Sequence, residues 1–112
     1  MATEAECREA LNQLAARLAA NAADVRKQLD LDRTLVCRVT DLAVAFRARL
    51  AGGRLVDIAD GDDPKAKIKL TTTSDDLVAL VQGKLDFARA LGARRVSISA
   101  SPFDLLKLRK LL

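Results

Sequence analysis

Residues 65–112 read KAKIKLTTTSDDLVALVQGKLDFARALGARRVSISASPFDLLKLRKLL, and this stretch decides the fold class. It opens with an alternating run in which apolar and polar side chains take opposite faces, which is typical of a half-buried β-strand. The apolar face of this predicted strand carries Ala66, Ile68 and Leu70. The stretch is dense in aliphatic residues and contains no catalytic side chain pattern, which indicates binding of something apolar.

Two helical segments are predicted after this strand. Ser74 is a good N-cap residue, and the carboxylates that follow it suit the positive end of a helix dipole. This first helix is expected to end at Gly83, since glycine readily takes the left-handed conformation that ends helices. A second helical piece is predicted over Phe87–Leu91 and is closed by Gly92.

A fifth strand and a final helix complete the chain. Val96 and Ile98 alternate with polar residues, and Ser101 is predicted to cap a helix with Pro102 at its first position. One apolar zone of this helix comprises Leu105, Leu108, Leu111 and Leu112, and a second zone comprises Phe103 and Leu106. Packing on a sheet needs one zone only, so the second predicts contact with a ligand, another subunit or a membrane surface. The alternative is that the second zone also fills the core.

The N-terminal half predicts a helix followed by a β-meander. Thr3 and Glu6 have the spacing of a capping box, so a helix is expected from Glu4 to about Asn21, with a short helical turn over Asp24–Leu29. Three alternating runs then predict antiparallel strands joined by tight turns, the last turn being Gly52-Gly53. These runs are Leu35–Thr40, Leu42–Leu50 and Arg54–Ala59.

The pattern as a whole predicts a single α+β domain over residues 1–112, with an about five-stranded, mostly antiparallel sheet and helices covering one face. The polar face would collect basic residues and be solvated. Nucleic acid is not expected there, because platforms of that kind use aromatic side chains for stacking. The basic residues are Arg38, Arg47, Arg49, Lys67, Lys69 and Arg95.

The composition limits the chemistry that is available. The chain has no histidine, which removes the commonest general base and metal ligand, and we expect a non-enzymatic protein without metal or cofactor. The acidic residues around Gly61 are interpreted as a solvated turn. Cys7 and Cys37 are expected to be reduced, buried thiols. With no signal peptide pattern and no apolar run of membrane-spanning length, we expect a cytoplasmic location.

Several of these motifs together resemble the sterol carrier protein type-two family in its small single-domain form. The resemblance rests on Gly61-Asp62-Asp63-Pro64-Lys65-Ala66, then Ile68-Lys69-Leu70-Thr71, then Ser74-Asp75-Asp76-Leu77-Val78-Ala79-Leu80-Val81-Gln82-Gly83-Lys84-Leu85. It extends over the first helix and the antiparallel strands, while Ala100 stands where the family usually has a glycine. The resemblance implies a lipid-binding domain in which helices and one sheet face enclose a hydrophobic tunnel.

The expected function is therefore carriage of a fatty acid, acyl-CoA, sterol or similar lipid. Residues expected to line the tunnel are Phe46, Ile68, Leu70, Leu77, Leu80, Val81, Leu85, Phe87 and Ile98, with Phe103, Leu105 and Leu106 as a lid. The alternative is an interaction module whose C-terminal helix forms a homodimer or binds another protein, with the tunnel reduced or lost. At most a transient membrane-surface contact is expected. A third hypothesis, a domain that is or serves a biosynthetic enzyme, is disfavoured by the missing histidine.

Overall fold

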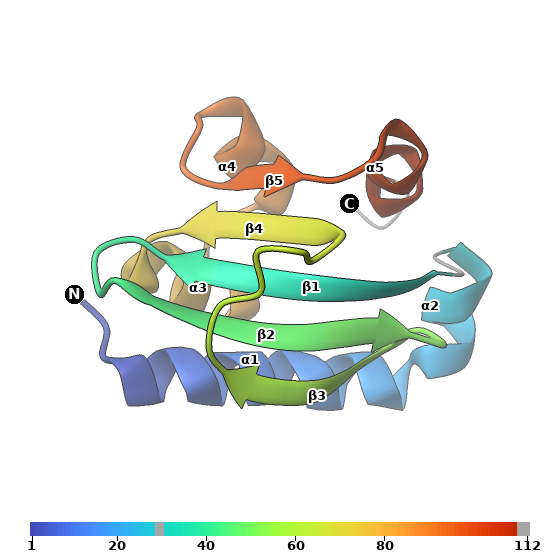
Figure 1. The fold of residues 1–112 in the computed structure, drawn as a ribbon, viewed down its shortest axis with the longest axis horizontal. Coiled ribbons are helices and arrows are strands. Elements are labelled where there is room, and N and C mark those ends of the chain that lie inside the picture. Colours follow the sequence, from blue (N-terminus) through green and yellow to red (C-terminus); the bar gives the residue numbers. More distant parts are fainter. Residues whose placement is uncertain (29–30, 110–112) are drawn as a thin grey trace.

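The computed structural model describes residues 1–28 and 31–109, which form one five-stranded sheet with helices packed against it (Figure 1). The strands lie in the order β3-β2-β1-β4-β5. Only β1 and β4 run parallel, and the other neighbours are antiparallel. The elements are α1 (Glu4–Ala20), α2 (Ala22–Gln28), β1 (Asp32–Val39), β2 (Val44–Ala51), β3 (Arg54–Asp60), β4 (Ile68–Thr72), α3 (Ser74–Val81), α4 (Phe87–Gly92), β5 (Ser97–Ser99) and α5 (Pro102–Arg109). The predicted α+β class and mostly antiparallel sheet are confirmed.

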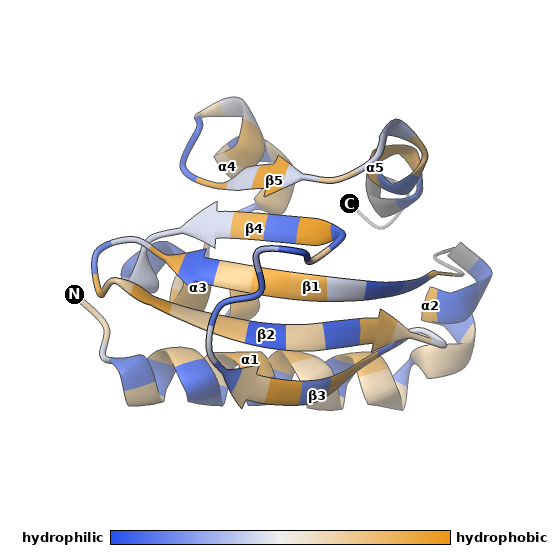
Figure 2. Cartoon of the chain, in the orientation of Figure 1, coloured by the Kyte–Doolittle hydropathy of each residue, from blue (hydrophilic) through white to orange (hydrophobic). Residues whose placement is uncertain are grey.

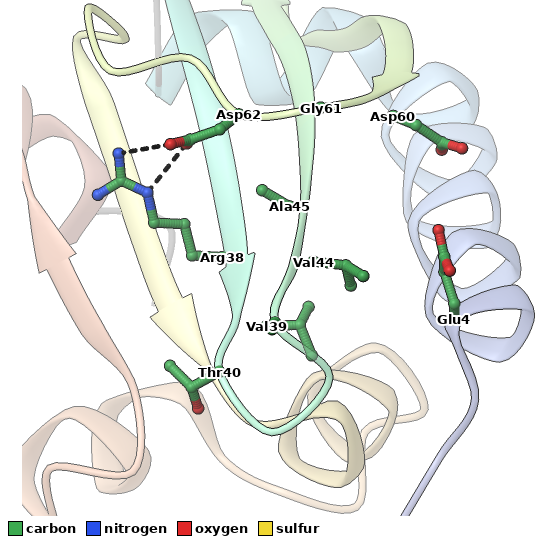
Figure 3. Close-up of a pocket in the computed structure, with 10 residues that line it drawn as sticks. Glu4, Arg38, Val39, Thr40, Val44, Ala45, Asp60, Gly61 and Asp62 are labelled. Atoms are coloured by element: carbon green, nitrogen blue, oxygen red, sulfur yellow. Dashed lines mark hydrogen bonds and ion pairs between the residues drawn. The ribbon is translucent and has the colours of Figure 1, made fainter.

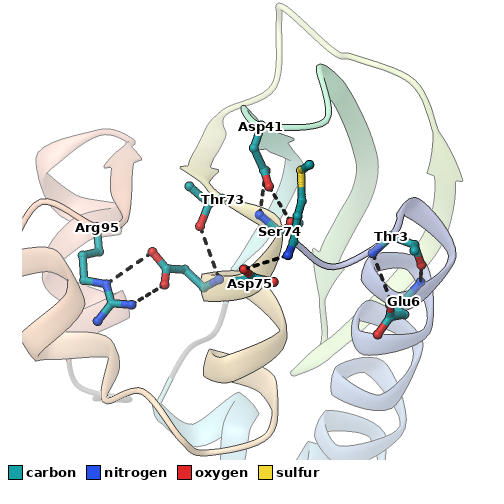
Figure 4. Close-up of polar contacts among 9 residues, drawn as sticks. Thr3, Glu6, Asp41, Thr73, Ser74, Asp75 and Arg95 are labelled. Atoms are coloured by element: carbon teal, nitrogen blue, oxygen red, sulfur yellow. Dashed lines mark hydrogen bonds and ion pairs between the residues drawn. The ribbon is translucent and has the colours of Figure 1, made fainter.

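The first helix begins as its sequence predicts. The Thr3 hydroxyl accepts a hydrogen bond from the Glu6 backbone N–H at 3.1 Å, and the Glu6 carboxylate accepts one from the Thr3 N–H at 3.1 Å (Figure 4). This reciprocal pair satisfies two donors that a helix start leaves free. The helix ends at Ala20 with Asn21 as its C-cap, one residue from the predicted end.

The core lies between the sheet and the helices α1 and α3. Residues directly opposite one another on neighbouring strands share a face, so Cys37 lies beside both Phe46 and Leu70. The buried cluster on this face is built almost entirely from aliphatic residues and cysteine, namely Cys7, Ala10, Leu11, Cys37, Val39, Phe46, Leu77 and Val81. Hydrophobic and hydrophilic residues alternate along the later part of β2 in Figure 2, whereas the middle of β1 is continuously hydrophobic.

The sequence predicted that the opposite face of the sheet would be solvated, but part of that face is covered. β3 lies at one edge and β4 on the far side of β1, so residues 61–67 must cross β2 and β1, and they do so in front of the sheet in Figure 1. Val36 of β1 is completely buried, and Ala66 of this crossing segment is buried as well. Asp62 of the segment pairs with Arg38 of β1 at 3.0 Å. The basic face is therefore partly covered and partly neutralised.

The start of α3 differs from the prediction by one residue. Thr73, and not Ser74, is the N-cap, because the Thr73 hydroxyl accepts a hydrogen bond from the Asp76 N–H at 3.3 Å. Ser74 is buried in the first turn, where its hydroxyl donates to Asp41 at 2.5 Å and its backbone N–H donates to the same carboxylate at 2.8 Å (Figure 4). A distant acidic residue thus engages the side chain that would otherwise have capped the helix.

Smaller corrections concern element boundaries. The turn between β1 and β2 includes Leu42, so the second strand begins at Val44. Gly92 is the last residue of α4 and Ala93 is its C-cap. Arg95 precedes β5 and does not belong to the basic face, because its guanidinium pairs with Asp76 of α3 at 2.5 Å.

Two of the predicted helices extend beyond the described residues. The short second helix is confirmed but begins at Ala22, and Leu29, with which it was predicted to end, lies outside the described residues. Leu111 and Leu112, which were assigned to the apolar zone of the last helix, also lie outside them. No helix in the described part of the chain is long and apolar enough to span a membrane.

Candidate functional site

An apolar pocket of about 370 Å³ opens beside the short helix α3. Its walls come from α1, β4, α3, α4 and the connection between the last two. The residues that line it are Leu14, Leu70, Leu77, Leu80, Val81, Gly83, Leu85, Asp86 and Phe87. Seven of these nine carry aliphatic or aromatic side chains, so the pocket offers a mostly apolar surface.

The pocket exists because α3 is short and the chain then turns back on it. Gly83 has a φ of +76°, a left-handed conformation that other residues adopt only with strain. The backbone N–H groups of Lys84 and Leu85 both donate to the Ala79 carbonyl, at 2.9 and 3.2 Å. This reversal places Leu85 and the start of α4 at Phe87 across the pocket from α3.

Polar contacts at the rim hold the walls together. The Arg17 guanidinium on α1 donates to the Val81 carbonyl at the end of α3 at 2.7 Å. A carbonyl in the last turn of a helix has no partner within the helix, so this contact satisfies an otherwise free acceptor. Asp86 accepts from the Arg89 N–H at 3.1 Å and caps α4. The rim is polar and the interior apolar, which suits a molecule with an apolar body.

The structure gathers six of the nine residues that the sequence predicted as tunnel lining. Those that line the pocket are Leu70, Leu77, Leu80, Val81, Leu85 and Phe87. Phe46 is buried in the cluster under α1, and Ile68 belongs to a second cluster with Leu31 and Leu50. Ile98 is half-buried on β5, opposite Leu70.

The three residues expected to form a lid lie elsewhere, on α5. Phe103 and Leu106 are exposed, and Leu105 is half-buried. None of the three lines the apolar pocket. In contrast, Leu14 of α1 does line it and was not among the predicted site residues. The available signal was that Cys7, Leu11, Leu14 and Leu18 recur at helical spacing and so share one face.

Two other depressions are larger but differ in chemistry. One, of about 510 Å³, lies beside the turn between β1 and β2 and is shown in Figure 3. Its carboxylates are engaged by arginines: Arg38 pairs with Asp62, while Arg8 pairs with Glu4 and Asp60. The other, of about 690 Å³ and here called the charged pocket, is lined by Asp32, Arg33, Thr34, Arg49, Lys67, Ser101 and Asp104. Lining chemistry, and not volume, therefore selects the apolar pocket as the candidate site for an apolar ligand.

The two cysteines and the acidic side chains were searched for a nucleophile or a metal site. Both cysteines are free and buried. Burial raises the pKa of the Cys37 thiol to about 12, and burial with nearby carboxylates raises the pKa of Cys7, so neither is a ready thiolate nucleophile. In residues 1–28 and 31–109 no group of three histidine, cysteine, aspartate or glutamate side chains could hold a metal ion.

Comparison with known proteins gives a family match over the whole chain. The family model described as Alkyl sulfatase C-terminal matches residues 1–112. Among solved structures, a double mutant of the sec-alkyl sulfatase PisA1, an enzyme from a Pseudomonas species, has 26% identity and a TM-score of 0.61 over 81% of this chain. The match covers 14% of the sulfatase, so this chain spans a small part of that protein's length.

Two sterol carrier proteins have the same fold over most of their length. The sterol carrier protein 2-like 2 protein of Aedes aegypti has 16% identity and a TM-score of 0.62, covering 94% of this chain and 98% of that chain. The sterol carrier protein domain 2 of Helicoverpa armigera has 16% identity and a TM-score of 0.67, covering 88% and 78%. The predicted resemblance to the sterol carrier protein type-two fold is confirmed. A comparison with curated protein sequences gave no match.

Proposed function

This chain belongs to the alkyl sulfatase C-terminal family, and from that premise we propose that it binds the alkyl chain of a lipid or similar apolar molecule in the apolar pocket. The observation that carries the proposal is the cluster of seven apolar side chains around about 370 Å³. The sterol carrier proteins of the same fold, one of them solved in a palmitated form, support the same function.

The size of the pocket narrows the class of ligand. A methylene group takes up about as much space as one water molecule in the liquid, roughly 30 Å³. The pocket of about 370 Å³ then accommodates about twelve methylene groups. A sterol has more than twice that number of carbon atoms. Among the lipids expected from the sequence, a single medium-length alkyl chain fits best, as in a fatty acid or an alkyl ester.

We propose that the domain holds its ligand without transforming it. The buried thiols have raised pKa values, and the chain has no histidine. The sec-alkyl sulfatase is a much longer protein of which the match covers 14%, so any chemistry on the bound molecule would reside outside this domain. In this proposal the domain presents an apolar substrate to a catalytic partner.

The test is ligand uptake by delipidated protein. We expect saturated fatty acids and alkyl sulfates to raise the melting temperature, and native mass spectrometry to show one bound molecule per chain. Leu80→Gln places a polar amide in the apolar pocket and should weaken uptake. Val78→Gln is the matched control, because Val78 is also half-buried on α3 but does not line this pocket.

Melting temperatures without ligand separate a binding defect from a folding defect in both variants. The proposal is wrong if no alkyl compound binds, or if the two variants lose binding to the same extent.

A further inference from the structure

The helix α5 carries an unusual pair of exposed apolar side chains. Phe103 is 78% exposed and Leu106 is 59% exposed. Besides Met1 they are the only large hydrophobic residues that are exposed in the described part of the chain. Single exposed apolar side chains are common and carry no meaning, but these two are three residues apart on one helix and so share one face.

The orientation of α5 is fixed by a contact on its inner side. Asp104 is only 3% exposed, and its carboxylate accepts a hydrogen bond from the Arg33 guanidinium on β1 at 3.1 Å. Its backbone N–H is capped by the Ser101 hydroxyl at 3.2 Å. Turning α5 to bury Phe103 would expose this ion pair and break the cap. The exposed apolar face is therefore a consequence of how the helix is anchored.

Basic side chains outnumber acidic ones around this face, and the two carboxylates of the adjacent charged pocket, Asp32 and Asp104, are paired with arginines. Lys107 is exposed and lies on the same face as Phe103, four residues along the helix. Asp104 is the only acidic side chain in residues 101–112, and it is turned inward and paired. The charged pocket beside the start of α5 adds Lys67, which is also exposed. The surface thus combines two apolar side chains with exposed ammonium groups.

From this combination we propose that α5 docks the protein on an anionic lipid surface, with Phe103 and Leu106 entering the headgroup–acyl boundary and Lys107 contacting anionic headgroups. Apolar side chains flanked by basic ones are what such interfacial helices use. This docking is independent of whether the apolar pocket is occupied.

The size and charge of the face argue against a second copy as its occupant. Two partly exposed side chains offer apolar area on the order of 250 Å². A stable protein interface buries about 800 Å² on each partner. Two copies meeting through this face would also bring like charges together. A lipid surface requires no such area and supplies the opposite charge.

The experiment uses the full chain and vesicles of neutral phosphatidylcholine, with or without anionic phosphatidylglycerol. Because the chain has no tryptophan, Phe103→Trp introduces a single reporter on α5, and Gln13→Trp on the exposed side of α1 is its control. We expect the emission of the α5 reporter to shift to the blue with anionic vesicles and to be quenched by brominated acyl chains. The control reporter should show neither effect.

One double variant and one pair of lysine variants test the residues named. The Phe103→Ser/Leu106→Ser variant should lose at least about tenfold in vesicle affinity while keeping its melting temperature, because both side chains are exposed. Lys107→Gln should cost about fivefold, the effect of one basic residue near an anionic surface. Lys27→Gln on α2 makes the same change in net charge at an exposed position and should cost less.

Three results would overturn the proposal. They are no binding to anionic vesicles, equal vesicle binding by wild type and the serine variant, and equal losses in the two lysine variants. A dimer in sedimentation experiments that the serine variant abolishes, without vesicle binding, would assign the face to self-association. Ligand uptake by the apolar pocket is measured separately, so failure here leaves that proposal standing, and the reverse also holds.

Discussion

The dependence of affinity on ligand chain length is the sharpest prediction from the apolar pocket. Burying one methylene group contributes about 0.8 kcal/mol, which is about a fourfold gain in affinity. The pocket of about 370 Å³ holds about twelve such groups at roughly 30 Å³ each. Affinity should therefore rise about 200-fold between chains of about eight and twelve carbons, and then stop rising.

Filling part of the pocket should move this break point. Leu80 lines the pocket and is half-buried, and Leu80→Trp adds the volume of about two methylene groups. The plateau should then begin near about ten carbons, while the slope for shorter chains stays the same. Gln82→Trp is the matched control, since Gln82 is exposed just past the end of α3 and does not line the pocket.

Isothermal titration calorimetry with a series of alkyl sulfates or fatty acids, kept below their critical micelle concentrations, provides the measurement. The reasoning would be refuted by a slope without a break up to about sixteen carbons, because the chain would then not be confined to this pocket. An equal displacement of the break in both tryptophan variants would refute it as well.

Three further predictions concern stability and reactivity. Hydrogen bonds from Ser74 lower the pKa of Asp41 in the folded protein. The ionised carboxylate therefore stabilises the fold at pH values above its ordinary pKa of about 3.9. This stabilisation is lost as the pH falls through the lower pKa that Asp41 has in the folded protein. Asp41→Asn should therefore flatten the loss of stability below about pH 4, measured as urea midpoints, and parallel curves for the two proteins would contradict this. Gly83→Ala should destabilise the protein by about 1 kcal/mol, because a side chain at φ +76° is strained although nothing lies within 4 Å of it. Gly92 lies in a helix and is equally unobstructed, so Gly92→Ala should instead stabilise the protein by about 0.5–1 kcal/mol. Chemical denaturation measures both changes. The two buried thiols should resist a thiol reagent at pH 8 in the folded protein and react fully in denaturant. Burial raises the pKa of Cys37 to about 12 and also raises the pKa of Cys7. Rapid labelling of the folded protein would show that the core opens.

Local patterns in the sequence predicted most of the fold. The capping box at Thr3, the alternating strands and the Ser101 cap all depend on residues a few positions apart, and all are present. Contacts between distant residues were the ones missed. The crossing segment follows from strand order, which alternation does not encode, and Ser74 is displaced from its expected role by Asp41, 33 residues away.

The site was partly predictable for the same reason. The leucines of α3 and the segment after it are close in sequence, and they do meet in one pocket. The position of α5 depends on the pairing of Asp104 with Arg33, 71 residues away. A helical wheel carries no information on such a contact, so it could not distinguish a lid over the pocket from an exposed face.

The sharp reversal after α3 has a consequence for how this domain can change through evolution. Residues 83–86 supply part of the pocket wall but no strand of the sheet, and the backbone N–H groups of residues 83–85 donate to the Ala79 and Leu80 carbonyls. Substitutions or insertions there would reshape the ligand space while leaving strand pairing and the buried cluster intact. Relatives could thus acquire different ligand preferences through this one short segment without losing the architecture that carries it.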